Sequence, residues 1–191
     1  MKRLAYIIRI ITVAPLMALV MLLILRFNRP DLIGAPIDFY LLITFLVVFP
    51  LLGYPLQPLI KIFKDRGREG QRTLAIYFAV AGYVLGCVSA AITSATAAVW
   101  LIYLSYLLSG LVILIFNKVF HLKASGHACG VVGPFAILCY FGQVAASIGM
   151  FLLGLIWASS IYMKRHTHLQ LLGGSLIPIL ALGFIILLLP V

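Results

Sequence analysis

Charged residues are scarce in this chain of 191 amino acids. Only 9% of the residues are Asp, Glu, Lys or Arg, whereas a soluble domain carries about 25%. Among the charged residues the acidic ones are the fewer, with 4 Asp and Glu against 14 Lys and Arg. Since 64% of the residues are hydrophobic, the chain has too few polar side chains to cover a water-facing surface. The composition excludes a soluble domain and indicates a polytopic membrane protein.

Other features are missing as well. The three cysteines Cys87, Cys129 and Cys139 are an odd number without framework spacing, which argues against a disulfide scaffold. There is no fixed-period repeat and no low-complexity tail, so residues 1–191 are expected to form a single transmembrane domain. The net charge of +10 comes from short basic clusters between apolar segments. Without a soluble basic domain, no nucleic-acid partner is expected.

Apolar runs of about 20 residues, long enough to cross a bilayer, recur along the chain. The predicted spans are residues 4–25, 39–60, 73–91, 95–116 and 171–189, with two shorter helices in 128–162 joined by a turn near 142–147. The first run has no small-x-small cleavage site before Arg26, so we expect a membrane helix rather than a signal peptide. Pro50, Pro55 and Pro58 predict kinks in the second. The expected fold class is all-α, a polytopic transmembrane helical bundle of seven spans, or six if residues 128–162 are re-entrant.

Three polar clusters interrupt the apolar runs: "KIFKDRGREGQR" at 61–72, "KASGH" at 123–127 and "MKRHTHLQ" at 163–170. Two predicted spans separate each cluster from the next. An even number of crossings returns the chain to the same side, so all three clusters are expected on one membrane face. Histidines and cations that converge at a membrane face indicate a functional site.

Each cluster has a structural and a functional interpretation. The first is either a positive-inside anchor or an anion clamp, because arginine forks match phosphate oxygens. In the second, Ser125 and Gly126 suit a plain helix cap or an anion site at a helix N-terminus. In the third, Gln170 shares a helix face with His166 and can hydrogen-bond one of its ring nitrogens, whereas His168 is read as an interfacial bystander. Together, cations and paired histidines indicate phosphoryl chemistry.

The clusters also resemble, in this order, the motifs K-x6-R-P, P-S-G-H and S-R-x5-H-x3-D of the type 2 phosphatidic acid phosphatase superfamily. "ASGH" matches the second motif with Ala124 in place of proline. "SSIYMKRHTHLQ" matches the third at Ser159 and His166, while Ser160 and Gln170 replace the motif's arginine and aspartate. "HTHLQLLGG" is similar to the H-T-x-x-Q-x-x-x-G form of a divergent branch.

The first motif has two alignments. Lys61 and Arg68 have the spacing of K-x6-R-P, with Glu69 in place of the proline. "DRGREGQR" also resembles a D-R-x-x-R form, which makes Arg66 and Arg72 rival phosphate ligands. The resemblance covers about residues 55–180 and implies a membrane-embedded helical enzyme with a phosphatase-like core.

The resemblance implies a role for each matching residue. His166 would be the nucleophile that forms a phosphohistidine, His127 the general acid for the leaving group, and Gln170 the residue that orients His166. The implied phosphate ligands are Lys61, Arg66, Arg68, Arg72, Ser125 and Gly126. No metal or other cofactor is implied, and the H-x-C and H-x-H spacings around His127 and His166 are a weak indication of zinc.

We therefore expect an integral-membrane lipid phosphate phosphatase. Its substrate would be a phosphate monoester or diphosphate of a membrane lipid, such as phosphatidic acid, phosphatidylglycerol phosphate or a polyprenyl phosphate. A phosphotransferase and a catalytically inactive lipid-binding or transport homologue stay open, since the motif arginine and aspartate are missing. All Lys and Arg residues except Arg26 and Arg29 fall on the site's face, so the positive-inside rule predicts a cytoplasmic site. The expected partners are the bilayer and its lipid phosphates, and the oligomeric state stays open.

Overall fold

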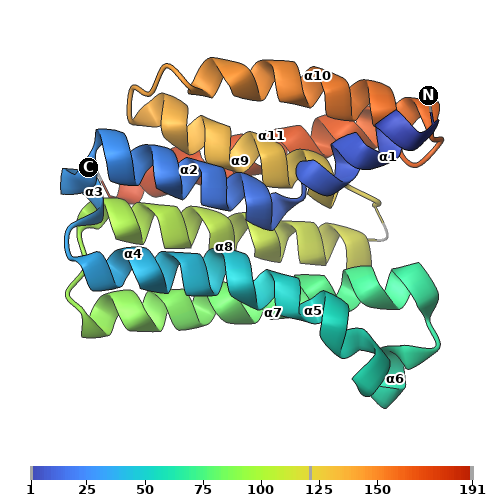
Figure 1. Ribbon diagram of the computed structural model, residues 1–191, viewed down its shortest axis with the longest axis horizontal. Coiled ribbons are helices and arrows are strands. Elements are labelled where there is room, and N and C mark those ends of the chain that lie inside the picture. Colours follow the sequence, from blue (N-terminus) through green and yellow to red (C-terminus); the bar gives the residue numbers. More distant parts are fainter. Residues whose placement is uncertain (1, 121, 190–191) are drawn as a thin grey trace.

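The protein folds as an antiparallel helical bundle (Figure 1). The computed structural model describes residues 2–120 and 122–189, with the backbone only for Lys2, Leu4, Ala5 and Arg68. Within these residues every regular element is a helix and none is a strand, which confirms the all-α class. The longer helices are α1 (Lys2–Ile11), α2 (Ala14–Asn28), α4 (Pro36–Ile43), α5 (Phe49–Leu56), α7 (Gly67–Ile92), α8 (Ala97–Lys118), α9 (Gly126–Tyr140), α10 (Ala146–Tyr162) and α11 (His168–Leu188). The short ones are α3 (Pro30–Ile33), η1 (Thr44–Val48), η2 (Gln57–Leu59) and α6 (Lys61–Lys64).

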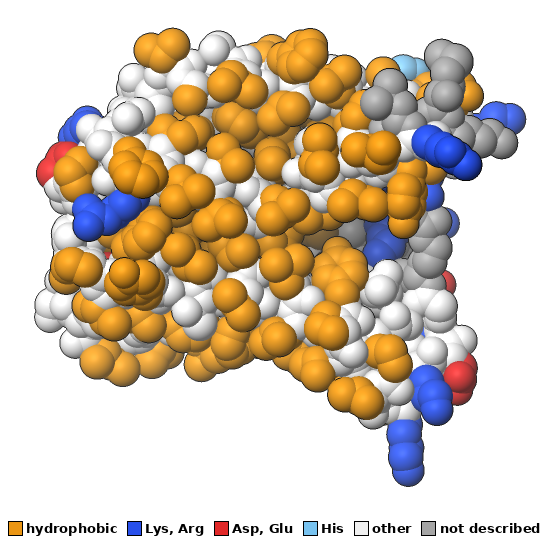
Figure 2. Space-filling model, viewed as in Figure 1, with side chains coloured by type: hydrophobic (Ala, Val, Ile, Leu, Met, Phe, Trp, Pro, Cys, Tyr) orange, Lys and Arg blue, Asp and Glu red, His pale blue; other side chains and the backbone are white. Residues whose placement is uncertain are grey.

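Four helical segments are long and apolar enough to cross a membrane. They are Pro36–Leu59, Glu69–Ile92, Ala97–Lys118 and His168–Leu188. Helices α2, α9 and α10 are apolar but shorter. Figure 2 shows hydrophobic side chains over most of the visible face, with Lys and Arg gathered toward its two ends. These features indicate a membrane protein, while the count of six to seven spans stays a prediction.

The first predicted span, residues 4–25, is not one continuous helix. Helix α1 ends at Ile11, and α2 starts at Ala14 after an extended Val13. Pro15 lies in the first turn of α2, where its missing N–H costs nothing. The hydroxyl of Thr12 donates to the Ile8 carbonyl oxygen at 2.6 Å, a local bond that competes with the helical hydrogen bonds at the end of α1. The two helices also differ in character, because α2 is one of the shorter apolar helices whereas α1, which contains Lys2, Arg3 and Arg9, is not.

The second predicted span contains the kinks that its prolines predict. Helix α4 passes into a π-helical segment, η1, before Pro50 in the first turn of α5. Pro55 lies inside α5, and the last turn before the polar cluster is the 3-10 helix η2, which contains Pro58. Each proline removes one backbone donor and loosens the helical hydrogen-bond ladder locally. The α5–α6 end bends away from the bundle in Figure 1.

Helix α9 lies at the centre of the bundle, against α2, α8, α10 and α11. Two glycines allow the close approaches. A Cβ on Gly130 would lie 2.2 Å from the Ala14 Cβ, so α2 reaches α9 only because this position is glycine. A Cβ on Gly174 of α11 would lie 2.3 Å from the Ser125 carbonyl oxygen. The N-terminus of α9 is therefore held against both the α1–α2 break and the start of α11.

The three polar clusters lie at the same end of the bundle. The α6–α7 region, the start of α9 and the start of α11 all lie at the right-hand end in Figure 1. The predicted turn near 142–147 connects α9 to α10 at the opposite end. This arrangement agrees with the even number of segments between successive clusters.

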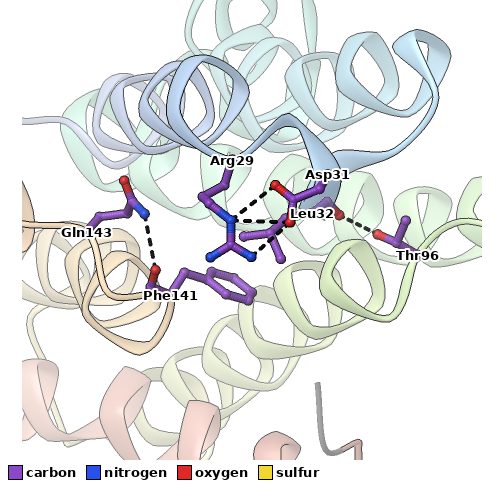
Figure 3. A network of polar contacts seen from close by, with 6 residues as sticks. All are labelled: Arg29, Asp31, Leu32, Thr96, Phe141 and Gln143. Atoms are coloured by element: carbon purple, nitrogen blue, oxygen red, sulfur yellow. Dashed lines mark hydrogen bonds and ion pairs between the residues drawn. The ribbon is translucent and has the colours of Figure 1, made fainter.

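A separate polar network fastens the loops of the opposite end (Figure 3). Arg29 and Asp31 form an ion pair at 2.8 Å, and the Thr96 hydroxyl donates to the Leu32 carbonyl oxygen. Gln143 donates to the Phe141 carbonyl oxygen at 3.1 Å. Because these bonds tie the α2–α3 corner to α8 and close the α9–α10 turn, they serve to hold the helices in register.

Candidate functional site

The second and third polar clusters meet through the backbone. The Ser125 N–H donates to the Gln170 carbonyl oxygen at 2.9 Å, which joins the N-terminus of α9 to the first turn of α11. The Ser125 hydroxyl accepts from the Ala128 N–H at 3.3 Å and is fully buried. Ser125 is thus the N-cap of α9, and this hydrogen bond satisfies its buried hydroxyl as an acceptor. Gly126 beside it has nothing within 4 Å of a Cβ position, which leaves open space at this helix end.

The C-cap of α10 determines the path of the chain through the third cluster. The Arg165 N–H bonds to the Ser160 carbonyl oxygen at 2.9 Å, and the Lys164 N–H bonds to that of Ile161 at 2.9 Å. Lys164 adopts the left-handed conformation with φ 51°. This pattern is a Schellman C-cap, which stops the helix and reverses the chain. His166 follows directly, in the loop between α10 and α11.

A capping box fixes the orientation of the Gln170 side chain. The Thr167 hydroxyl accepts from the Gln170 N–H, and the Gln170 Oε1 accepts from the Thr167 N–H, both at 3.3 Å. The same Oε1 lies 3.1 Å from the His166 Nδ1. Because a backbone N–H can only donate to oxygen, this amide atom is an acceptor, and the Nδ1 of His166 must carry the proton. In the neutral ring, the Nε2 of His166 then keeps its lone pair.

The hydrogen bonds of Thr12 determine the tautomer of His127 in a similar way. Its Oγ1 lies 2.9 Å from the His127 Nε2 and 2.6 Å from the Ile8 carbonyl oxygen. A hydroxyl has one proton, and the carbonyl oxygen can only accept it, so Thr12 accepts from the His127 Nε2–H. The Nδ1 of His127 is therefore the nitrogen that gains and loses a proton.

Positive charges surround His127. Burial lowers the pKa of His127 to about 3, and Arg9, His166, Arg72 and Arg165 act in the same direction through their charges. Among the described groups that shift this pKa, none is a carboxylate. His127 is consequently neutral at physiological pH, and an anion bound beside it would raise its pKa.

His166 lies in the same field. Burial lowers the pKa of His166, the hydrogen bond with Gln170 raises it, and the charges of Arg72, Arg9 and Arg165 lower it further. A neutral imidazole with a free Nε2 is the form of histidine that can act as a nucleophile. Three guanidinium groups from α1, α7 and the α10–α11 loop thus act on both histidines.

Arg9 was not expected from the sequence patterns as a site residue. Its guanidinium donates to the Ser160 hydroxyl at 2.7 Å, which brings α1 to α10 across 151 positions of sequence. Ser160 occupies the position where the resembling motif has an arginine, and it is fully buried. One signal was available, since a charged residue inside an apolar run is a functional candidate by default.

The predicted phosphate ligands of the first cluster separate in space. Arg72 on α7 acts on both histidines. Lys61 is exposed on the short helix α6, and Arg66 is exposed with its guanidinium 6.0 Å from the Phe63 ring centre. Neither has a described contact with the histidines, and the Arg68 side chain lies outside the described part of the chain. Among the described side chains of this cluster, Arg72, which is also exposed, is therefore the one whose charge acts on both histidines.

His168 points to a different partner from His166. The Trp157 Nε1–H donates to the His168 Nδ1 at 2.8 Å, and His168 is exposed. This contact gives His168 a structural role at the junction of α10 and α11.

The surface beside His166 is hollowed. An open depression of about 450 Å³ lies there. Its lining consists of Lys123, Ile161, Lys164, Arg165, His166, Thr167 and Gln170. Lys118 at the end of α8 adds a further cation, which donates to the Thr73 hydroxyl at 3.0 Å. In the described part of the chain, no three His, Cys, Asp or Glu residues gather as a metal site requires.

Comparison with protein-family models, curated proteins and solved structures gives no match to this chain. The chemistry of the site therefore has to be inferred from its own residues.

Proposed function

We propose that this protein is an integral-membrane phosphatase that hydrolyses a phosphate monoester or diphosphate of a membrane lipid. The observation that carries the proposal is the pairing of two neutral histidines of opposite tautomer within the field of Arg9, Arg72 and Arg165. The positive charges of these three guanidinium groups attract an anion to the two histidines. A phosphate group, with two negative charges and oxygens that match guanidinium forks, suits this field.

The two ring nitrogens supply the chemistry. The Nε2 of His166 attacks phosphorus, so that an N–P bond forms as the P–O bond to the lipid breaks. The bound phosphate raises the pKa of His127, whose Nδ1–H then protonates the leaving lipid oxygen. Water next attacks the phosphorus atom and passes its proton to the Nδ1 of His127, while the N–P bond breaks and its electron pair returns to the Nε2 of His166. The products are inorganic phosphate and the lipid alcohol, or the lipid monophosphate if the substrate is a diphosphate.

The membrane character of the chain supports a lipid substrate. The site lies at one end of an apolar bundle, the depth at which lipid head groups lie if the bundle spans the bilayer. We extend the proposal to seven crossings, in which α1–α2 forms the first and the shorter α9 and α10 form the fifth and sixth. The site would then face the cytoplasm, because most cations lie at that end.

Phosphate release from purified protein tests the proposal. A panel of phosphatidic acid, phosphatidylglycerol phosphate and polyprenyl phosphates and diphosphates should contain a substrate. His166→Ala should abolish its hydrolysis, whereas His168→Ala, the matched control at the same helix junction, should retain it. His127→Ala should impair hydrolysis strongly for lipid alcohols and mildly for good leaving groups, since only a poor leaving group needs the proton.

Several results would contradict the proposal. Full activity in His166→Ala, or loss of activity in His168→Ala alone, would place the chemistry elsewhere. Transfer of the phosphoryl group to an added alcohol instead of water would identify a phosphotransferase. Lipid binding without turnover of any member of the panel would identify an inactive lipid-binding protein.

A further inference from the structure

Arg9 occupies an unusual place for an arginine. It lies near the end of α1, within an apolar run in which a membrane anchor would use hydrophobic residues. Its side chain is half-buried and bonds to Ser160 on α10, which is fully buried. An arginine that anchors a helix to lipid head groups extends toward water, whereas Arg9 is directed at the interior of the bundle end.

The α1–α2 break explains why Arg9 reaches this place. Gly130 lets Ala14 approach α9, so the chain before Ala14 passes directly beside the α9 N-terminus. Thr12 contacts His127 there, and Arg9, one turn earlier, contacts α10. Two residues of one turn thus connect α1 to both histidine-bearing regions.

The charge of Arg9 acts at both histidines. Its half-buried guanidinium lowers the pKa of His127 and of His166, as Arg72 and Arg165 also do. A phosphate group that contacts both rings would be attracted by these charges and would accept charge-assisted hydrogen bonds from the guanidinium.

We infer that Arg9 is a ligand of the substrate's phosphate group, held in place by Ser160, so that α1 is part of the active site. The inference rests on the proposed phosphate chemistry and assigns the N-terminal helix a direct part in it.

Paired arginine variants test the inference. Arg9→Gln keeps a donor for Ser160 but removes the charge, and Arg3→Gln on the same helix, where Arg3 is exposed, is the matched control. Loss of one transition-state ligand should lower kcat/KM by about 10²–10³-fold in Arg9→Gln. Inorganic phosphate should inhibit the wild type and Arg3→Gln alike, and Arg9→Gln much more weakly.

The outcomes separate this inference from the proposed function. Wild-type turnover and phosphate inhibition in Arg9→Gln would overturn the inference alone. Phosphate binding that depends on Arg9, in a protein that hydrolyses none of the lipids, would support the inference and defeat the proposed activity. If Arg9→Gln does not fold, Arg9→Lys and Arg3→Lys are compared by the rise in melting temperature with added phosphate. A smaller rise in Arg9→Lys supports the inference, because an ammonium lacks the guanidinium fork, and equal rises overturn it.

Discussion

At the residue scale, the hydrogen bonds give the two histidines different titrating nitrogens. Gln170 holds the proton of His166 on Nδ1, and Thr12 holds that of His127 on Nε2. In the neutral rings, His166 therefore keeps its lone pair on Nε2 and His127 keeps its lone pair on Nδ1. An amide orients His166 without the charge that a carboxylate would add, so that burial and the neighbouring guanidinium groups still lower its pKa.

The pKa of His127 leads to a testable prediction. Because burial and neighbouring cations lower this pKa to about 3, His127 should stay neutral between about pH 5 and 8 in the phosphate-free protein. Added inorganic phosphate should raise its pKa, since an anion favours the protonated ring. Nitrogen NMR of isotope-labelled histidine, assigned with His127→Ala, measures both states. A His127 that is already charged near pH 6 without phosphate would contradict this prediction.

At the element scale, close backbone contacts fix the geometry of the site. Gly174→Ala places a methyl group against the Ser125 carbonyl oxygen, which cannot move without disturbing the α9 cap. We expect this change to lower stability by about 1–3 kcal/mol and to reduce activity. Gly173→Ala is the matched control, because a Cβ there meets nothing within 4 Å. It should be neutral or stabilising by up to about 1 kcal/mol.

Thermal unfolding and phosphate release, measured on both glycine variants, test this expectation. Equal behaviour of Gly173→Ala and Gly174→Ala would mean that the α9–α11 contact does not determine the site.

The sequence predicts the helices better than it predicts the contacts between them. Apolar runs indicate the segments from the second onward, and the capping box of α11 is visible in "THLQ". The α1–α2 break escapes prediction because reading residues 4–25 as one apolar run does not show where the backbone leaves the helix. The Arg9–Ser160 contact escapes it because the two residues are 151 positions apart and only the packed bundle brings them together. Motif spacing alone could not show that Arg72, rather than Lys61 or Arg66, acts on the histidines. That difference depends on the direction in which α6 leaves the bundle.

At the scale of the whole molecule, the charges lie mainly at the two ends of an apolar bundle. In Figure 1, α1 begins at the site end and α11 finishes at the opposite end, which fits the proposed odd number of crossings. The site end holds the three basic clusters, and the opposite end has the Arg29–Asp31 pair. The positive-inside rule therefore predicts a cytoplasmic site end.

Cysteine labelling in a background without the native cysteines tests this orientation. Ala35 and Lys64 are both exposed and lie at opposite ends of the Pro36–Leu59 segment. A membrane-impermeant thiol reagent should modify Ala35→Cys in intact cells and Lys64→Cys only after permeabilisation. The reverse pattern would place the site on the outer side, and modification of both in intact cells would contradict a crossing between them.

The covalent intermediate tests the central claim most directly. Protein mixed with a radiolabelled lipid phosphate and quenched during turnover should carry label that is stable in alkali and lost in acid, as expected for a phosphohistidine. The label should map to the peptide that contains His166, remain in His168→Ala and be absent from His166→Ala. Turnover without any labelled protein, or label that persists in His166→Ala, would contradict the assignment of His166 as the nucleophile.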